Sequence, residues 1–420
     1  MFYRETDFQE TSLGKIPKDW AVVRLKDVSL DFVGGGTPST LNPDYWNGEF
    51  AWMTSAHIIG ATVNSGQKYI TKKGLENSAT NLIPKNNILV ATRVGIGKVT
   101  INRIDIAISQ DLTGVIINRN EALPEFLYWF LTSNDRRLKS LAQGSTIKGI
   151  LKEDLSRLCI PHLSLEEQKT IVGVLGVADL AVGKTCEVIA KTERLKKGLM
   201  QELLTRGIGH MKFTHSEELG HEIPEEWEAV KLETVSLGFI GGGTPSTSNP
   251  DYWNGEIAWM TSAHINGRLI TSGQKYITKK GLENSATNLI PKDNLLVATR
   301  VGIGKAAINK IDIAISQDLT GVIINKDKAI PEFLYWAIAS NEKKLKSLAQ
   351  GSTIKGILKE DLSRLFIPKP HIPEQQKIAE VLSTVDRKLA VERKVKAKLE
   401  RVKQSLMDLL LTGKIRVKVN

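Results

Sequence analysis

The chain has 420 residues, enough for two or three domains with cores of their own. A hydrophobic fraction of 41% and a charged fraction of 25% are typical of a soluble globular protein. No apolar run reaches the length of about 18 residues that a membrane span needs, and the polar N-terminus does not predict a secretory signal. The net charge of +11 favours a polyanionic partner such as nucleic acid, although a solvated basic surface accounts for the charge equally well.

The same unit is written twice along the chain. Three of the duplicated segments are GGGTPST at 34–40 and 241–247, LVATRVGIGK at 89–98 and 296–305, and KSLAQGSTIKGILKEDLSRL at 139–158 and 346–365. All are offset by 207 residues, a period far longer than that of solenoid repeats. The sequence therefore predicts a duplicated domain with its connector. The cysteines Cys159 and Cys186 are matched by Phe366 and Arg393, which argues against a paired role and predicts reduced thiols in a cytoplasmic protein.

The first part of each copy, residues 16–160 and 223–367, mixes short β-type runs with Gly, Pro and Asn turns. In chain order, strands are predicted at 88–92 (ILVAT), 104–109 (IDIAIS) and 114–117 (GVII). One helix is predicted over 124–141, because a proline suits the first helical turn and an apolar stripe follows it. The stripe consists of Phe126, Leu127, Phe130, Leu131, Leu138 and Leu141. We assign this part to an irregular α+β domain.

The second part of each copy, residues 166–205 and 373–412, predicts a long helix, because residues that break helices are few. Apolar residues step by three and four along it, with one slip, and so narrow a stripe needs a partner helix. We therefore expect the two helices, each about 60 Å long, to form an antiparallel coiled coil. The alternative is two separate amphipathic helices, each lying on its own domain. The seam positions are Ile171, Leu175, Ala178, Val182, Leu195 and Leu199 in the first copy and Ile378, Leu382, Val385, Leu389, Val395, Leu399, Val402, Leu406 and Leu409 in the second.

These patterns together predict an α+β fold with two near-identical mixed α/β domains, related by a pseudo-two-fold axis. The two domains are expected at residues 1–162 and 211–369. The long helices that join them are expected at residues 163–210 and 370–420.

Several segments resemble enzyme motifs, but none has the required spacing. Asn42-Pro43-Asp44-Tyr45 resembles a methyltransferase loop and residues 239–243 resemble a nucleotide-binding glycine turn, yet no βαβ unit lies between such elements. Residues 95–98 lack the first glycine of a phosphate loop. Ser55 and His57 lack an identifiable orienting carboxylate, and no His and Cys spacing fits zinc. We therefore expect no catalytic residues, metal or cofactor in this chain.

Several repeated segments suit contacts with DNA. Arg93 and its copy Arg300 follow an apolar strand, and we favour them as base readers because Arg binds guanine in a bidentate manner. Gln110 and Gln143 suit adenine in the same geometry. The glycine loop at 34–40, the basic cluster at 68–73 and the turn at 145–148 suit phosphates, with tight turns or solvated faces as the alternatives. The predicted DNA-binding residues are Gly35, Thr37, Ser55, His57, Lys68, Lys72, Lys73, Arg93, Lys98, Gln110, Gln143, Thr146 and Lys148, with Gly242, Thr244, Ser262, His264, Lys275, Lys279, Lys280, Arg300, Lys305, Gln317, Gln350, Thr353 and Lys355 in the second copy.

An ordered set of motifs covers nearly the whole chain. Each copy opens with Ile-Pro to Trp, at 16–20 and 223–227, and continues with Gly-Gly-Gly-Thr-Pro and then with Gly-Ser-Thr before Ile-Pro at 160–161. The long helices open with Glu167-Gln168-Lys169 or Glu374-Gln375, and they close with Leu-Leu-Thr. As a set, these motifs resemble the specificity subunit of type I restriction-modification systems. Any one of them alone would be weak.

The resemblance implies that each mixed domain reads one half of a bipartite DNA site, with the helices setting the gap between the halves. It also implies docking to two DNA methyltransferase (modification) subunits, and to restriction subunits where these are present. S-adenosylmethionine, ATP and magnesium are then expected on those partners and not on this chain. Members of the family usually carry two dissimilar domains. Two near-identical readers related by a two-fold axis instead predict an interrupted palindrome as the target.

Three alternatives remain open. The segment IGATVN at 59–64 is replaced by NGRLIT at 266–271. If Arg268 reached a base, the two half-sites would differ at one position. The alternative is that these surface residues have diverged without an effect on DNA recognition. The main rival function is a coiled-coil scaffold that binds proteins and whose basic charge is incidental. A second rival is an active methyltransferase or nuclease.

Overall fold

The computed structural model describes residues 2–144, 148–349 and 356–418. Contacts between residues divide the chain into two compact units. Unit 1 consists of Met1–Cys186 with Lys394–Asn420, and unit 2 consists of Glu187–Arg393. Both boundaries fall inside a long helix, so each unit holds one mixed domain and a segment of each long helix. None of the helices in these ranges is long and apolar enough to cross a membrane.

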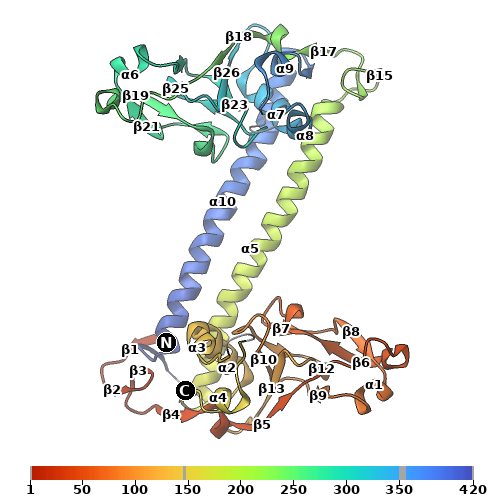
Figure 1. The fold of residues 1–420 in the computed structure, drawn as a ribbon, viewed down its shortest axis with the longest axis vertical. Coiled ribbons are helices and arrows are strands. Elements are labelled where there is room, and N and C mark those ends of the chain that lie inside the picture. The colour runs from red at the N-terminus through yellow and green to blue at the C-terminus, as the bar shows by residue number, and fades with distance from the viewer. Residues whose placement is uncertain (1, 145–147, 350–355, 419–420) are drawn as a thin grey trace. The chain divides into compact units, whose positions relative to one another are not determined.

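The mixed domain of unit 1 contains two mixed sheets (Figure 1). One sheet has the strand order β5-β13-β10-β11-β7 and the other has the order β8-β6-β12-β9. Most neighbours are antiparallel, but β7 pairs with β11 and β6 pairs with β12 in parallel. The strands are β5 (Ser29–Gly34), β6 (Trp46–Met53), β7 (Thr62–Val63), β8 (Lys68–Ile70), β9 (Asn81–Ile83), β10 (Ile88–Ala91), β11 (Val99–Asn102), β12 (Ile106–Ile108) and β13 (Leu112–Ile117).

The three predicted strands are confirmed as β10, β12 and β13. All four residues of β10 are buried, because its two faces belong to different cores. Ile88 and Val90 pack into the core that includes α2, whereas Leu89 and Ala91 pack between the two sheets. A strand covered on both faces is a continuous apolar run and does not alternate with polar residues, which explains the sequence ILVA.

Smaller elements complete unit 1. A short helix, α1 (Lys72–Glu76), lies beside β6 and β8, and α4 (Lys152–Ser156) precedes the strand β14 (Cys159–His162). β14 pairs with β4 (Ala21–Arg24), and β2 (Phe8–Thr11) pairs with β3 (Gly14–Pro17).

The single helix predicted over 124–141 is wrong, because the chain forms two helices there. They are α2 (Pro124–Ser133) and α3 (Asp135–Ser140), separated at Asn134. The Asn134 side chain donates a hydrogen bond to the carbonyl of Phe130 at 2.9 Å, and the Asn134 backbone leaves the helical region. A short polar side chain that bonds the preceding turn in this way competes with helix continuation. Asn341 breaks the second copy in the same manner.

Unit 2 repeats this architecture in the same order. Its sheets are β18-β26-β23-β24-β20 and β21-β19-β25-β22. Its elements are β15 (Phe213–Ser216), β16 (His221–Pro224), β17 (Glu228–Lys231), β18 (Ser236–Gly241), β19 (Trp253–Met260), β20 (Leu269–Ile270), β21 (Lys275–Ile277), α6 (Lys279–Glu283), β22 (Asn288–Ile290), β23 (Asn294–Ala298), β24 (Ala306–Asn309), β25 (Ile313–Ile315), β26 (Leu319–Ile324), α7 (Pro331–Ser340), α8 (Glu342–Ser347), α9 (Lys359–Ser363) and β27 (Phe366–Lys369).

The two long helices are α5 (Leu165–Thr205) and α10 (Ile372–Leu410), as predicted. Within unit 2, Glu193 of α5 binds Arg393 of α10, and Lys196 binds Asp386. The residue numbers rise along one helix as they fall along the other, so the pair is antiparallel. In unit 1, Asp179 of α5 binds Lys403 of α10 at 2.6 Å. The predicted antiparallel helix pair is therefore confirmed within each unit.

The predicted seam is buried in part: Leu389, near the middle of α10, is only 2% exposed, and other seam residues are buried near the helix ends. Ile171 and Leu175 pack with Met407 and Leu410 in the core of the unit 1 domain, and Leu203 and Leu204 pack with Ile378 and Leu382 in the core of unit 2. Three other seam positions are exposed: Leu195 by 54%, Val395 by 39% and Val402 by 52%. The helices thus pair with each other and also lie on the domains, which combines the two alternatives that the sequence left open.

A buried arginine, Arg416, links the N- and C-terminal strands to the rest of unit 1. Strand β28 (Ile415–Val417) pairs with β1 (Phe2–Arg4), and Arg416 between them is only 7% exposed. Its guanidinium binds the carboxylates of Glu167, Asp19 and Glu5 at 2.6–2.9 Å. The pKa of Asp19 is lowered by its hydrogen bonds from Arg416. Three acidic partners compensate the desolvation of one guanidinium, which an isolated buried charge would not tolerate.

We predict that Arg416→Met destabilises unit 1 by about 3 kcal/mol, because it leaves the buried carboxylate of Glu167 without its cation. Hydrogen exchange of the full chain checks this by comparing amides of the two units. In unit 2, the matching carboxylate of Glu374 is bound by His210 and Trp227, so protection there should not change. Equal loss of protection in both units would contradict a local role for Arg416.

Candidate nucleic-acid interface

A cleft of about 420 Å³ lies in unit 1 where the end of β10, the loop after β5 and the start of α4 meet. It brings together three predicted residues, Gly35, Arg93 and Gln110, with two that the sequence did not single out, Asn81 and Lys152. The full lining is Gly34, Gly35, Ala79, Asn81, Thr92, Arg93, Gln110, Leu112, Thr113, Ile150, Leu151, Lys152 and Glu153.

The loop at 34–40 needs glycines because it packs directly against backbone atoms. A Cβ at Gly35 would lie 2.1 Å from the carbonyl oxygen of Ile108, and a Cβ at Gly36 would lie 2.6 Å from Ala79. The amide of Gly36 donates to the same Ile108 carbonyl at 2.9 Å. The second copy makes the same approach at Gly242. Packing therefore explains the glycines, and their effect on the cleft is to bring the loop against the strand that leads to Gln110.

The loop orients one of the predicted base readers. The hydroxyl of Thr37 donates a hydrogen bond to the side-chain oxygen of Gln110 at 2.6 Å, and Thr244 donates to Gln317 at the same distance. All four side chains are exposed. An amide oxygen has two lone pairs, so Gln110 keeps one acceptor position and both N–H donors for a further partner. The hydrogen bond fixes which end of the amide faces that partner.

Arg93 and Lys98 lie on a tight turn that continues from β10. The Ala91 amide donates to the Lys98 carbonyl and the Gly97 amide donates to the Ala91 carbonyl, which closes the turn. The turn needs Gly95 and Gly97 because both have positive φ angles, 68° and 92°. Arg93 and Lys98 are exposed, and no salt bridge involves either side chain in the part of the chain that the structure describes. Their positive charges are therefore available to an anion. The copies Arg300 and Lys305 lie on the matching turn of unit 2.

Lys152 is the cation that sequence reasoning missed. Its Cε lies 2.9 Å from the position that a Cβ would take on Gly34, and Lys359 lies 2.8 Å from that position on Gly241. Glycine at these positions therefore makes room for the lysine stem across the loop. In the sequence, Lys152 lies in the charged segment KEDL, a pattern that is typical of the solvent-exposed start of a helix. Duplication of that run does not distinguish this lysine from its neighbours.

The predicted basic cluster does not line the cleft. Lys68 on β8 and Lys72 and Lys73 on α1 lie at the edge of the four-stranded sheet opposite β9. Lys73 binds Asp44 at 2.7 Å, which raises the pKa of Lys73 and lowers that of Asp44. Lys68 lies over the ring of Trp46, and Lys72 pairs with Glu76. Lys275, Lys279 and Lys280 repeat these contacts with Trp253, Glu283 and Asp251. Exposed ion pairs of this kind are weak and exchange readily for a phosphate.

Ser55 is buried and His57 is half-buried. Ser55 is 2% exposed, and His57 Nε2 lies 3.1 Å from the carbonyl oxygen of Ser65. In the second copy, Ser262 is also buried and donates to Asp318, while His264 is half-buried. Buried hydroxyls cannot reach a DNA groove without opening the loop, so Ser55 and Ser262 are left out of the interface that we propose below.

The turn before α4 is anchored next to Arg93. The backbones of Gln143 and Gly149 bond each other, and Ile150 donates to the carbonyl of Thr92 at 2.8 Å. Gln143 also donates its side-chain amide to Asp154 at 2.9 Å, which occupies one of the groups suited to adenine. Lys148 is exposed. The predicted residues Thr146, Gln350, Thr353 and Lys355 lie outside the described residues.

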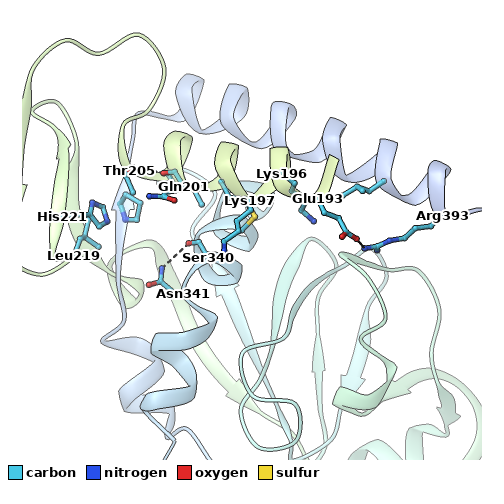
Figure 2. A pocket seen from close by; sticks show the side chains of 14 residues that line it. Glu193, Lys196, Lys197, Gln201, Thr205, Leu219, His221, Ser340, Asn341 and Arg393 are labelled. Atoms are coloured by element: carbon cyan, nitrogen blue, oxygen red, sulfur yellow. Dashed lines mark hydrogen bonds and ion pairs between the residues drawn. The ribbon is translucent and has the colours of Figure 1, made fainter. Parts of the chain in front are cut away.

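A separate cavity of about 530 Å³ lies along α5 in unit 2 (Figure 2). Its wall is apolar at Met200, Leu204, Leu219 and Leu389, and Arg393 binds Glu193 at one end. No predicted DNA-binding residue lines it. In the described ranges, no cluster of three or more His, Cys, Asp or Glu side chains could hold a metal ion.

Comparison with known proteins identifies the family. The family model described as "Type I restriction modification DNA specificity domain" matches residues 17–182 and 224–401, one match in each copy. The chain belongs to this family. It therefore carries two DNA specificity domains of the type I restriction-modification kind.

Relatives and solved structures of the family cover almost the whole chain. The putative type I restriction enzyme MjaX specificity subunit of Methanocaldococcus jannaschii is 28% identical over 99% of this chain and 98% of its own length. The MjaVIII specificity subunit of the same organism has the same identity and coverage. The crystal structure of a type I S subunit from M. genitalium shares the fold, with a TM-score of 0.61 at 17% identity over 93% of this chain and 96% of that one.

We predict that Lys152→Gln combined with Lys359→Gln weakens DNA binding to all sequences alike, because a lysine at the cleft floor neutralises phosphates and does not read bases. Loss of one phosphate contact per copy should reduce the slope of log K against log salt by about 1.8. Binding titrations over a series of salt concentrations measure this slope. The matched control is Lys85→Gln with Lys292→Gln, two exposed lysines beyond the other ends of β9 and β22. An unchanged slope for the cleft variant would exclude Lys152 and Lys359 from the interface.

Proposed function

We propose that the chain is the DNA-reading subunit of a type I restriction-modification complex and that the cleft residues of unit 1 and their copies in unit 2 read the DNA. The observation that carries the proposal is the repetition of the cleft's polar groups in both units. The Thr–Gln hydrogen bond is 2.6 Å in each copy. Lys152 lies over Gly34 in unit 1, and Lys359 lies over Gly241 in unit 2. Both units therefore present the same polar groups in the same arrangement, as two equivalent DNA readers require.

The cleft offers the three kinds of group that DNA readers combine. Arg93 is exposed and forms no ion pair with the residues that the structure describes, so its guanidinium suits the O6 and N7 acceptors of guanine. Gln110 has an oriented amide, which suits the donor and acceptor of adenine. Lys152 and the lysines of the β8 edge supply charge for phosphates, which position the protein without reading sequence.

Two sets of positions that differ between the copies do not offer different base contacts. Val99 and Thr100 are replaced by Ala306 and Ala307, but all four residues are buried in a strand. Arg268, the other candidate, has only 11% of its side chain exposed, and its Nε lies 4.0 Å from Asp386 on α10. The idea that Arg268 reads a base is therefore not supported. We propose that both units read the same half-site and that the target is an interrupted palindrome.

The remaining roles follow from membership of the family. We propose that the chain has no catalytic centre and docks two DNA methyltransferase subunits, and restriction subunits where the cell has them. S-adenosylmethionine, ATP and magnesium would then be bound by those partners, in the cytoplasm of a prokaryotic cell. Exposed apolar residues on the helix segments of each unit, Leu195 in unit 2 and Val395 and Val402 in unit 1, support protein docking on the long helices.

A selection from random duplex DNA tests the proposed function, using the full chain together with its methylating partner. We expect two inverted, identical half-sites at a fixed spacing. Recovery of two different half-sites would support sequence-specific DNA binding but contradict the proposal that both copies bind the same sequence. No enrichment of any sequence would favour the rival interpretation, a protein scaffold with incidental basic charge, which also predicts weak binding that changes little with salt.

We predict that Arg93→Ala combined with Arg300→Ala relaxes base preference at one position of each half-site, because a bidentate Arg–guanine contact is worth about 1–3 kcal/mol. Competition binding with duplexes that differ at single positions measures the change. Uniform weakening across all duplexes would instead reassign both arginines to phosphate contacts.

A further inference from the structure

Each unit contains a three-way contact where its mixed domain meets both long helices. In unit 1, Lys403 of α10 binds Asp179 of α5 at 2.6 Å, and its ammonium lies 4.9 Å from the ring centroid of Trp129 on α2. Unit 2 repeats the contact with Lys196, Asp386 and Trp336, at 2.5 Å and 4.9 Å. We call each set of three side chains a junction triad.

The triads join elements that are remote in the sequence. The aspartate of each triad lies on the helix that follows its own domain, whereas the lysine lies on the helix that follows the other copy. Lys196, for example, follows the first domain in sequence but contacts Trp336 of the second domain. Lys196 also lines the cavity along α5 (Figure 2). One side chain therefore ties a domain to both helices at once.

The tryptophan and lysine of each triad are largely sheltered from water, whereas the side chains of Asp179 and Asp386 are 39% and 30% exposed. Trp129 is 5% exposed and Trp336 is 1% exposed, and both lysine side chains are about three-quarters buried. The neighbouring Tyr335 has its pKa raised to about 12 by burial and then by Asp386, and the pKa of Tyr128 is raised by burial and then by Asp179. Ion pairs and cation–π contacts hold their geometry better in such a setting than on an open surface, where water competes for the charges.

We infer that the junction triads are positioning residues that fix the angle between each recognition domain and the helix pair, and so set the spacing of the DNA half-sites. The inference rests on the proposed function, because only a bipartite reader has a spacing to set. Adding one base pair between half-sites moves the second by about 3.4 Å and turns it by about 35°. A domain that pivoted on its helices would accept both spacings. A domain held to both helices by its triad, next to the core residues that it shares with them, would discriminate between the two spacings.

The two triads differ in one respect. Unit 2 adds Arg268 beside Asp386, where unit 1 has Ala61. The Nε of Arg268 is buried without a hydrogen-bond partner among the described residues, which leaves it free to approach Asp386 if Lys196 is lost. Unit 2 should therefore tolerate removal of its triad lysine better than unit 1 does. The effects of removing the triad lysine from unit 1 and from unit 2 can therefore be compared with each other.

The test compares Lys403→Met and Lys196→Met in the full chain with its methylating partner, by selection from random duplex DNA. Met keeps the length of the lysine stem and removes the charge. For Lys403→Met we expect unchanged half-sites, with spacings one base pair longer and shorter now recovered. Preference for the wild-type spacing should fall about tenfold, within the range of coupling between residues in contact. Lys196→Met should show the same change to a smaller extent, because Arg268 remains.

The control is Arg393→Met, which removes the exposed ion pair with Glu193 (Figure 2). That pair joins the helices but involves no domain residue, so the spacing should not change. Asp179→Asn keeps the shape of the triad and should broaden spacing as Lys403→Met does, which keeps the test valid if the Met variant fails to fold. A wild-type spacing distribution in a folded triad variant would overturn the inference. Loss of all sequence enrichment by the wild-type chain would instead overturn the proposed function.

Discussion

The structure depends on one packing constraint: the core of each mixed domain is completed by segments of both long helices. Ile171 and Leu175 of α5 and Met407 and Leu410 of α10 belong to the same buried cluster of unit 1. Neither helix could bury these residues alone, and the domain would expose its own apolar surface without them. This constraint explains why contacts divide the chain within the helices and not at their ends.

The same constraint explains how polar groups are used along the helices. Near the helix ends, apolar residues enter the domain cores, and next to them a lysine, an aspartate and a tryptophan close the contact with the domain. Farther along, seam positions such as Val395 are exposed and the helices are also joined by ion pairs such as Glu193 with Arg393. A surface salt bridge contributes little to stability, so the domain contacts carry most of the helix packing. The exposed apolar residues remain available to partner proteins.

The reading cleft shows how backbone packing prepares a polar site. Gly35 lets its loop lie against β12, and this approach brings Thr37 to Gln110. The same glycine run admits the stem of Lys152 at Gly34. The turn that carries Arg93 follows a strand buried on both faces, which makes its starting point rigid. Side chains held in this way lose less entropy on binding than side chains on a mobile loop.

Much of this architecture could be predicted from the sequence, because duplication and helical periodicity are long-range patterns. The long helices, their antiparallel pairing and the strands at β10, β12 and β13 were confirmed. The break at Asn134 was missed because the apolar stripe continues across it, while a single side-chain hydrogen bond decides the outcome. The burial of Arg268 and the position of Lys152 were missed for a different reason: each depends on a contact with a residue far away in the sequence, which no local pattern encodes.

The central claim is that two equivalent domains read the same bases in opposite orientations. The most direct measurement compares the affinity of the chain, with its methylating partner, for two synthetic duplexes. Both carry the same two half-sites at the same spacing, but one has them as an inverted repeat and the other as a direct repeat. The account predicts strong preference for the inverted repeat. Equal affinity for both duplexes, or preference for the direct repeat, would contradict it.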